Sequence, residues 1–255
     1  PKIAIIATSF SGGGAERVAV NLANEFSKSG LEVDFLVIRN KGPNKVLLNA
    51  SVTLVDLNVS RTIKSLIPLR RYIKRNDDRF YISVIRDANI VLGLAALGIN
   101  NLNVVFREAN PLSNLPQAWL PSFIYKSLMR YTYRKSKLVI ANSNDTKLSL
   151  VHSSIVEESR IRVIPNPVLS EDYLQSTKIP LSIPEEYEDG ARIILSVGRL
   201  SRQKDFPTLI RAFSRVAKDR PNVKLVIIGD GDERVRLLQL CGELKVASRV
   251  MILPY

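Results

Sequence analysis

Short apolar runs alternate along the chain with stretches whose apolar positions have helical spacing. The first run, at residues 2–7, is followed by apolar residues at helical spacing from Ala15 to Phe26 and then by a second run at 31–38. A strand, a helix and a strand in this order favour a parallel sheet covered by helices. Gly30 should end the helix, because glycine readily takes the left-handed conformation common after a last helical turn.

The same alternation continues along the rest of the chain and predicts the α/β class. We expect further strands at 52–57, 81–85, 104–106, 138–141, 160–168, 193–197, 223–228 and 250–253. We expect further helices at 61–74, from Asn144, from Asp205 and at 233–244, with Pro68 interrupting the first of them. The run at 193–197 is nearly continuous in apolar residues, which is typical of a strand buried on both faces of a parallel sheet.

Residues 169–190 differ from the rest of the chain, since they are polar and interrupted by prolines. A segment of this composition is typical of a linker between domains. A chain of 255 residues is also long enough for two domains. We therefore expect a first domain at 1–168, a linker at 169–190 and a second domain at 191–255.

The net charge of +13 is concentrated in one part of the chain. Residues 61–137 contain fourteen Lys or Arg and four Asp or Glu, a balance of +10. Such a basic block indicates an anionic partner, which the residues leave open between a membrane surface and a nucleic acid. Its most aromatic part, 118–137, suits a helix lying in a lipid headgroup layer and equally a helix packed on the sheet with a solvated basic edge.

The apolar runs are too short for a signal peptide core or a transmembrane helix. The single cysteine, Cys241, cannot form an internal disulfide, which fits a reducing compartment. We therefore expect a cytoplasmic protein, peripheral on the inner face of the cell membrane if the basic block binds lipid. His152 has no neighbouring His or Cys, so no metal site is expected there.

A basic loop follows the strand expected at 193–197. It contains Arg199 and Lys204 and leads into a helix at Asp205, a frequent N-cap residue type, with Pro207 close behind. The start of a helix presents free backbone N–H groups and the positive end of its dipole to an anion. An arginine and a lysine at this place are typical of a phosphate site, although two solvated loop cations would give the same pattern.

Three consecutive glycines, Gly12, Gly13 and Gly14, follow the first strand, at the end where ligands of open α/β sheets bind. Their spacing differs from G-x-G-x-x-G, because Arg17 stands where the third glycine is needed, so a Rossmann-type dehydrogenase is disfavoured. No G-K-[ST] follows, which excludes a P-loop. A tight strand-to-helix turn remains the alternative to a ligand site.

Residues 198–213 read GRLSRQKDFPTLIRAF and resemble the donor-loop signature of glycosyltransferase family 4, a family of retaining enzymes with the GT-B fold. The resemblance implies two Rossmann-like domains that face a cleft. The first would bind the acceptor and the second a nucleotide-sugar, expected to be a UDP-sugar. It also implies that Arg199 and Lys204 bind the diphosphate and act in catalysis. Their charges would stabilise the leaving group without a metal or another cofactor.

Other segments resemble the same family. The residues FREANP are similar to a Ser-Glu-x-Asn segment of family members, which implies a catalytic place for Glu108 and a cleft position for Asn110; Ala109 stands where some members carry histidine. The remaining matches are Gly13, Gly14, Gly229 and Asp230 for the donor, and Gly12, Ser143 and Asn166 for the acceptor side of the cleft.

The Gly-Asp-Gly-Asp residues at 229–232 admit two interpretations. Asp230 and Asp232 could form the metal-binding pair of the other main glycosyltransferase fold. Family 4 members carry Gly-Asp-Gly here as a turn, and this interpretation is favoured. A later family segment with two glutamates is absent from these residues, so we expect the second domain to be truncated.

The function expected from these features is sugar transfer from a nucleotide-sugar to a saccharide or lipid-linked saccharide, with retention of configuration, in polysaccharide or glycolipid biosynthesis. The alternative is a nucleic-acid or polyanion binding protein that uses residues 61–137, although the resemblance predicts no nucleic acid partner. The alternative requires an affinity that falls steeply with salt and no turnover of nucleotide-sugars.

Overall fold

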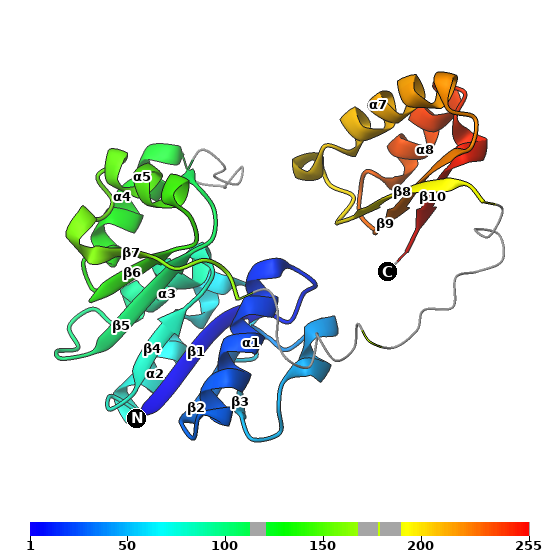
Figure 1. Ribbon diagram of the computed structural model, residues 1–255. Coiled ribbons are helices and arrows are strands. Elements are labelled where there is room, and N and C mark those ends of the chain that lie inside the picture. The colour runs from blue at the N-terminus through cyan, green and yellow to red at the C-terminus, as the bar shows by residue number, and fades with distance from the viewer. Residues whose placement is uncertain (113–120, 168–177, 179–189, 255) are drawn as a thin grey trace. The chain divides into compact units, whose positions relative to one another are not determined.

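The computed structural model describes residues 1–112, 121–167, 178 and 190–254 (Figure 1). The chain divides into two compact units, which we call the N-terminal unit (Pro1–Ser176) and the C-terminal unit (Thr177–Tyr255). The division falls inside the linker expected at 169–190, most of which lies outside the described residues. The domain boundaries given above therefore stay predictions, and each unit is described by itself.

The N-terminal unit contains a seven-stranded sheet in the order β3-β2-β1-β4-β5-β6-β7, and every described pairing in it is parallel. Its strands are β1 (Lys2–Ser9), β2 (Glu32–Arg39), β3 (Thr53–Asp56), β4 (Phe80–Ser83), β5 (Asn103–Glu108), β6 (Leu138–Ala141) and β7 (Ile161–Val163). Because all strands run in one direction, the sheet has an amino edge, where they begin, and a carboxyl edge, where they end.

Helices cover both faces of this sheet. The described helices are α1 (Gly14–Lys28), α2 (Leu66–Arg75), α3 (Arg86–Ala95), α4 (Ser122–Tyr133) and α5 (Asn144–His152), with 3-10 turns η1 (Pro43–Leu47), η2 (Thr62–Ser65) and η4 (Glu158–Arg160). Successive strand residues point to opposite faces. Ile3 and Ile5 of β1 therefore join a core with α1, whereas Ala4 and Ile6 join a core with α2, α3 and α4.

One expectation for this unit was wrong, and one helix was not anticipated. Sequence periodicity gave no helix at α3, because seven of its ten residues are buried and no polar face sets a period. Pro68 does not interrupt a helix over 61–74, because a 3-10 turn, η2, precedes α2 and Pro68 lies in the first turn of α2. The N–H groups of a first turn have no acceptor within the helix, so a proline there removes no hydrogen bond. The helix end at Gly30 is confirmed, with a φ of 78°.

The C-terminal unit has a three-stranded parallel sheet in the order β10-β9-β8. Its strands are β8 (Arg192–Val197), β9 (Val223–Ile228) and β10 (Val250–Leu253); its described helices are α7 (Phe206–Asp219) and α8 (Arg234–Glu243), with 3-10 turns η6 (Arg202–Lys204) and η7 (Ala247–Arg249). Leu225 and Ile227 of β9 pack with Phe213 and Leu237 of the two helices to form its core.

The expectation that β8 is buried on both faces is wrong for the described residues. Leu195 is 59% exposed and Val197 is 61% exposed. β8 lies at one side of the described sheet, next to β9. Its register with β9 pairs Leu195 with Val226, which lies on the face of the sheet opposite to Leu225 and Ile227. The helices pack on the face that carries Leu225 and Ile227.

Within the described parts of both units, no helix combines the length and the apolar composition needed to cross a bilayer.

Candidate functional site

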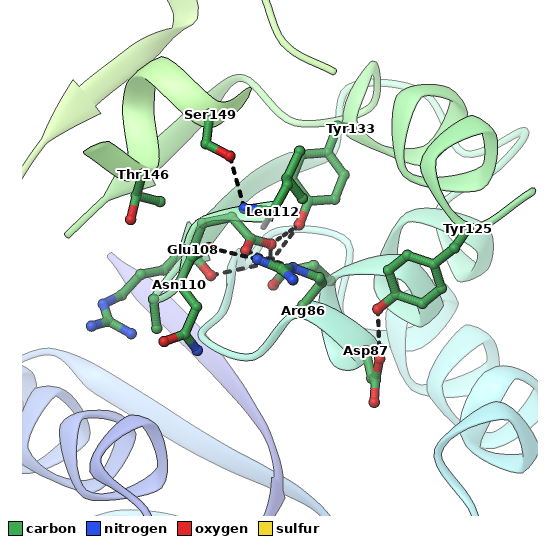
Figure 2. A network of polar contacts seen from close by, with 12 residues as sticks. Arg86, Asp87, Glu108, Asn110, Leu112, Tyr125, Tyr133, Thr146 and Ser149 are labelled. Carbon is green, nitrogen blue, oxygen red and sulfur yellow. Dashed lines mark hydrogen bonds and ion pairs between the residues drawn. The ribbon is translucent and has the colours of Figure 1, made fainter. Parts of the chain in front are cut away.

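The most densely bonded polar group in the N-terminal unit lies at the carboxyl edge of its sheet, around the segment that follows β5 (Figure 2). Glu108 is the last residue of β5 and is 1% exposed. Its neighbour strand β4 ends at Ser83, and α3 begins at Arg86 shortly afterwards. Because β4 and β5 pair in parallel, the first turn of α3 meets the end of β5.

Three side chains donate hydrogen bonds to the Glu108 carboxylate. Arg86 Nε lies 2.9 Å from Oε2, and Asn89 Nδ2 lies 3.1 Å from Oε1. The Tyr133 hydroxyl, from α4, donates to the same Oε1. Both oxygens are therefore occupied by the protein, and the carboxylate faces the interior. Family resemblance placed Glu108 among the catalytic residues, and that role stays a prediction.

Burial controls the ionisation of this group. Burial raises the pKa of Glu108 above its ordinary value, although the charge of Arg86 and the three hydrogen bonds act in the opposite direction. Burial likewise raises the pKa of Tyr133 well above that of a free tyrosine, and the neighbouring carboxylate adds to the rise. The phenol of Tyr133 therefore stays protonated at neutral pH and remains a donor to Glu108.

The residues after Glu108 are fixed through their backbone. The carbonyl of Asn110 accepts from Arg86 Nη2 at 2.5 Å, and that of Ala109 accepts from Asn142 Nδ2 at 2.8 Å. The N–H of Leu112 donates to Ser149 Oγ at 2.7 Å. The side chain of Asn110 itself is exposed. The segment 108–112 is thus a rigidly held backbone that presents Asn110 at the carboxyl edge.

Two further predicted site residues lie at the ends of neighbouring strands. Ser143, after β6, is the N-cap of α5, and its Oγ accepts from the N–H of Thr146 at 3.2 Å. Asn166, after β7, is exposed, and its Oδ1 accepts from Arg107 of β5. Arg107 is only 3% exposed, and burial lowers its pKa. The carboxyl edge therefore carries Glu108, Asn110, Ser143 and Asn166, and the roles that the resemblance implies for them stay predictions.

The glycine loop occupies the same edge at the end of β1. Gly13 is the N-cap of α1, and Gly12 and Gly14 are exposed. A neighbouring turn braces the loop: Asn44 Nδ2 donates to the carbonyl of Ser11 at 2.5 Å. Gly42 in this turn has a φ of 132°, and a Cβ there would lie 2.1 Å from the Phe10 carbonyl oxygen, so only glycine fits.

In the C-terminal unit, two loops meet at the carboxyl edge of the sheet. The N–H of Leu200 donates to the Asp230 carbonyl at 2.9 Å, and the N–H of Glu233 donates to the Leu200 carbonyl at 3.1 Å. A Cβ on Gly229 would lie 2.0 Å from the Gly198 carbonyl oxygen, so glycine is required for this approach. The turn expected at 229–232 lies slightly later in the chain, over 231–234, where the N–H of Arg234 donates to the Gly231 carbonyl oxygen.

Arg199 and Lys204 are both exposed on this loop, and neither side chain has a hydrogen bond or ion pair with a described residue. The Cδ and Cε atoms of Lys204 lie 3.8 and 3.9 Å from the Cβ that Gly198 would carry, so its stem runs over that glycine. Asp205 takes the expected N-cap position of α7, but it does not cap the helix through its side chain. Asp205 precedes α7 with a φ of 48°, and its side chain makes no capping bond.

The predicted site residues thus fall into two groups, one on each unit. The N-terminal group contains Gly12, Gly13, Gly14, Glu108, Asn110, Ser143 and Asn166, and the C-terminal group contains Arg199, Lys204, Gly229 and Asp230. Sequence reasoning missed Arg86, Asn89, Tyr133 and Asn142. The contacts that join them to Glu108, to Ala109 and to one another span 19 to 44 residues in sequence, and no local pattern signals such pairs.

Two family models match this chain. The model described as "Glycosyltransferase Family 4" matches residues 12–171, and the model described as "Glycosyl transferases group 1" matches residues 182–255. The first covers more than half of the chain.

Curated relatives come from bacteria, an archaeon and yeast. An α-1,4-N-acetyl-D-galactosaminyltransferase of Campylobacter jejuni, named as acting on a diphospho-undecaprenol-linked saccharide, is 25% identical over 249 residues, which are 92% of this chain and 63% of that protein. The lipopolysaccharide core biosynthesis glycosyltransferase LpsE of Rhizobium meliloti is 26% identical over 243 residues, 93% of this chain and 62% of LpsE. The chain thus spans less than two thirds of the length of these relatives.

Solved structures share the fold. HepE of Anabaena in complex with UDP-glucose has a TM-score of 0.74 at 18% identity, covering 100% of this chain and 69% of HepE. The lipopolysaccharide outer core galactosyltransferase WaaB has a TM-score of 0.65 at 21% identity, covering 100% of this chain and 68% of WaaB. The fold is therefore the GT-B fold of glycosyltransferases, and the chain belongs to glycosyltransferase family 4.

Proposed function

We propose that the whole protein transfers a sugar from a nucleotide-sugar, with a UDP-sugar as the expected donor, to a lipid-linked or lipopolysaccharide-type saccharide, with retention of configuration. The relatives named for diphospho-undecaprenol-linked saccharides and for lipopolysaccharide core support the acceptor class. Similar structures solved with UDP and UDP-glucose support the donor class. The family supports the retention of configuration.

The observation that carries this proposal is the pair of exposed cations on the loop after β8. Arg199 and Lys204 have no protein partner among the described residues, and the loop is braced by backbone bonds to the segment 230–233. Two free cations on a rigid loop beside the N-terminus of α7 form a site for a diphosphate. Holding them in place before the reaction removes the cost of reorganising them as the diphosphate leaves.

The chemistry follows from this placement. As the bond between the sugar and the diphosphate breaks, negative charge develops on the leaving phosphate oxygens, and Arg199 and Lys204 stabilise it. The acceptor approaches from the face of the sugar that the diphosphate leaves, and the departing phosphate oxygen takes the proton of the acceptor hydroxyl. No protein base is therefore needed. In the N-terminal unit, Gly12 and the exposed Asn110 are assigned to the acceptor side, and Gly13 and Gly14 to the donor.

The test is nucleotide diphosphate release by the whole protein from a panel of nucleotide-sugars. Arg199→Ala and Lys204→Ala should each reduce turnover by roughly a hundredfold or more, since each removes a charge-assisted phosphate contact. Arg202→Ala is the matched control, because Arg202 is an exposed cation of the same loop that the proposal does not use. Equal turnover in all three variants would refute the phosphate site.

We also propose that the basic block contacts an anionic membrane surface. Five of its cations are engaged within the unit: Arg70, Arg79, Arg86, Arg107 and Arg130 all donate to protein oxygens. Exposed cations remain on α2 (Arg71, Lys74, Arg75) and at the end of α4 (Arg134, Lys135, Lys137). Exposed apolar side chains lie on the same helices, with Ile67 at 62% and Phe123 at 70%.

Buried Tyr125, Met129 and Tyr133 show that α4 packs on the sheet, so a membrane would meet only its outer face. Each cation near an anionic leaflet contributes about 1 kcal/mol. Changing Arg134, Lys135 and Lys137 together to Ser should therefore weaken co-sedimentation with anionic vesicles strongly. The matched control is the change of Arg211, Arg215 and Lys218, which are exposed on α7, to Ser. Binding that ignores lipid charge, or binding to RNA instead, would contradict the membrane assignment.

A further inference from the structure

We propose that Arg86 is a positioning residue of the acceptor site, which couples the buried Glu108 carboxylate to the backbone of the exposed Asn110. The proposal rests on the proposed function, in which Asn110 lies on the acceptor side. In this proposal Glu108 does not contact the substrate and acts only by holding Arg86 in place.

The guanidinium of Arg86 bridges two different kinds of group. Its Nε contacts Glu108 Oε2 at 2.9 Å, and its Nη2 contacts the Asn110 carbonyl oxygen at 2.5 Å (Figure 2). The side chain of Arg86 is 10% exposed. The planar fork of a guanidinium fixes the angle between its two contacts, so the position of one acceptor sets the position of the other.

The Glu108 end of this bridge is itself fixed from the interior. Asn89 and Tyr133 both donate to Oε1, while Oε2 is left to Arg86. Asn89 Nδ2 also donates to the Tyr133 hydroxyl oxygen at 2.9 Å and to the Arg107 carbonyl oxygen at 3.1 Å, which locks it between strand and helix. The carboxylate is therefore a rigid anchor, and Arg86 carries its position outward to Asn110.

Stability alone does not account for this arrangement. A fully buried ion pair has to repay a large desolvation cost and is weak evidence for net stabilisation. The contacts of this group converge on the backbone of 108–112, from Arg86, from Asn142 and from Ser149. None of these bonds uses the side chain of Asn110. That amide therefore stays available to a ligand while its backbone is held, as preorganised binding requires.

A positioning role and a purely structural role predict different kinetics. Loss of a structural ion pair lowers the folded fraction and reduces activity without changing the KM of either substrate. Loss of positioning raises the KM of the acceptor and leaves the KM of the donor unchanged, because the phosphate loop lies on the other unit. Hydrogen exchange gives a second readout, since amides in 109–112 should exchange faster when their backbone is released.

The test compares Arg86→Lys and Arg86→Met with the matched control Arg79→Met in the whole protein. Arg79 is a buried, paired arginine at the opposite edge of the same sheet. Arg86→Met should raise the acceptor KM by roughly tenfold or more and speed exchange at 109–112. Arg86→Lys keeps the charge beside Glu108 but cannot span both acceptors, so it should show the same KM effect with a smaller loss of stability. Arg79→Met should show neither effect.

An unchanged acceptor KM together with unchanged exchange in both Arg86 variants would overturn the proposal. An equal rise in acceptor KM in Arg79→Met would overturn it too, because the effect would then follow general destabilisation. If the unsubstituted protein releases no nucleotide diphosphate with any donor, the proposed function fails instead. The exchange measurement still decides in that case whether Arg86 holds the segment 108–112.

Discussion

Two buried ion pairs lie at opposite edges of the N-terminal sheet and use the same chemical groups. At the carboxyl edge, Arg86 pairs with Glu108, which Tyr133 also contacts. At the amino edge, Arg79, just before β4, pairs with Asp34 of β2 at 3.0 Å, and Tyr72 donates to the same aspartate. Each site thus contains an arginine, a carboxylate and a tyrosine, all drawn from different elements.

The two sites differ in how the arginine is paired, although each leaves a buried polar atom without a described partner, Oδ1 of Asn89 at the carboxyl edge among them. Arg79 makes both of its ion pairs, to Glu32 and Asp34, through Nη2, while its Nε and Nη1 are buried without a described partner. At the carboxyl edge both oxygens of Glu108 are occupied, and Arg86 bonds to the backbone of an exposed residue. The amino-edge group includes the half-exposed Glu32, and none of the predicted site residues lies beside it. We therefore expect similar pairs to serve different purposes according to the edge they occupy.

The largest effect is expected for Glu108→Leu. The substitution leaves Arg86 and the Tyr133 hydroxyl buried without their acceptor, and breaking a buried pair in this way costs about 3–5 kcal/mol. Urea unfolding should show this loss. Turnover per folded molecule should fall as well, with a raised acceptor KM. Normal kinetics in the folded fraction would show that the two edges do not differ in function.

Arg79→Met should cost a similar free energy of unfolding, about 3–5 kcal/mol, because Asp34 is left buried without its guanidinium. Two unpaired guanidinium nitrogens disappear at the same time, so the loss should lie at the low end of that range. Turnover per folded molecule should not change, since the amino edge carries none of the assigned site residues. A selective rise in the acceptor KM would contradict the comparison.

The strands could be predicted from sequence because short apolar runs report burial on a parallel sheet directly. The helix α3 could not, because Ala88, Ile90, Val91 and Leu92 are all buried and leave no polar face to set a period. The exposure of the β8 side chains was also not predictable, because an apolar run predicts burial whether or not another element covers the strand. Burial in the finished structure depends on neighbouring elements, which a local pattern does not contain.

Site residues show the same limit. Glycines, the Arg199 and Lys204 loop and Glu108 were found because family motifs are local in sequence. Arg86 was not, because its partner Glu108 is 22 residues away, and the pairing depends on β4 and β5 being neighbours in the sheet. Arginine at a helix start carries no signal of its own. Motifs therefore pointed to residues that are close together in sequence, and the structure supplied the distant residues that contact them.

Tyr72→Phe should have a smaller effect at the amino edge. It removes one hydrogen bond to the Asp34 carboxylate and keeps the ring, and a bond to a charged group contributes about 1.5–3 kcal/mol. Thermal or urea unfolding should show a loss in this range, with kinetics per folded molecule unchanged. A loss as large as that of Arg79→Met would mean that the tyrosine, rather than the ion pair, holds this edge together.

The smallest effect concerns pH and separates the two edges by titration. Burial raises the pKa of Glu108 above the ordinary value of 4.5, so the folded state binds the proton more tightly than the unfolded state. The stability that this group contributes is complete below pH 4.5 and is lost as the pH rises through the folded-state pKa, with a slope of at most about 1.4 kcal/mol per pH unit. Glu108→Gln stays neutral and should lack this loss. Above pH 4.5, the unfolding free energy of Glu108→Gln should therefore rise relative to that of the unsubstituted chain. Arg79→Met leaves the Glu108 carboxyl untouched and should keep the slope. A difference that is constant with pH would show that burial does not dominate the ionisation of Glu108.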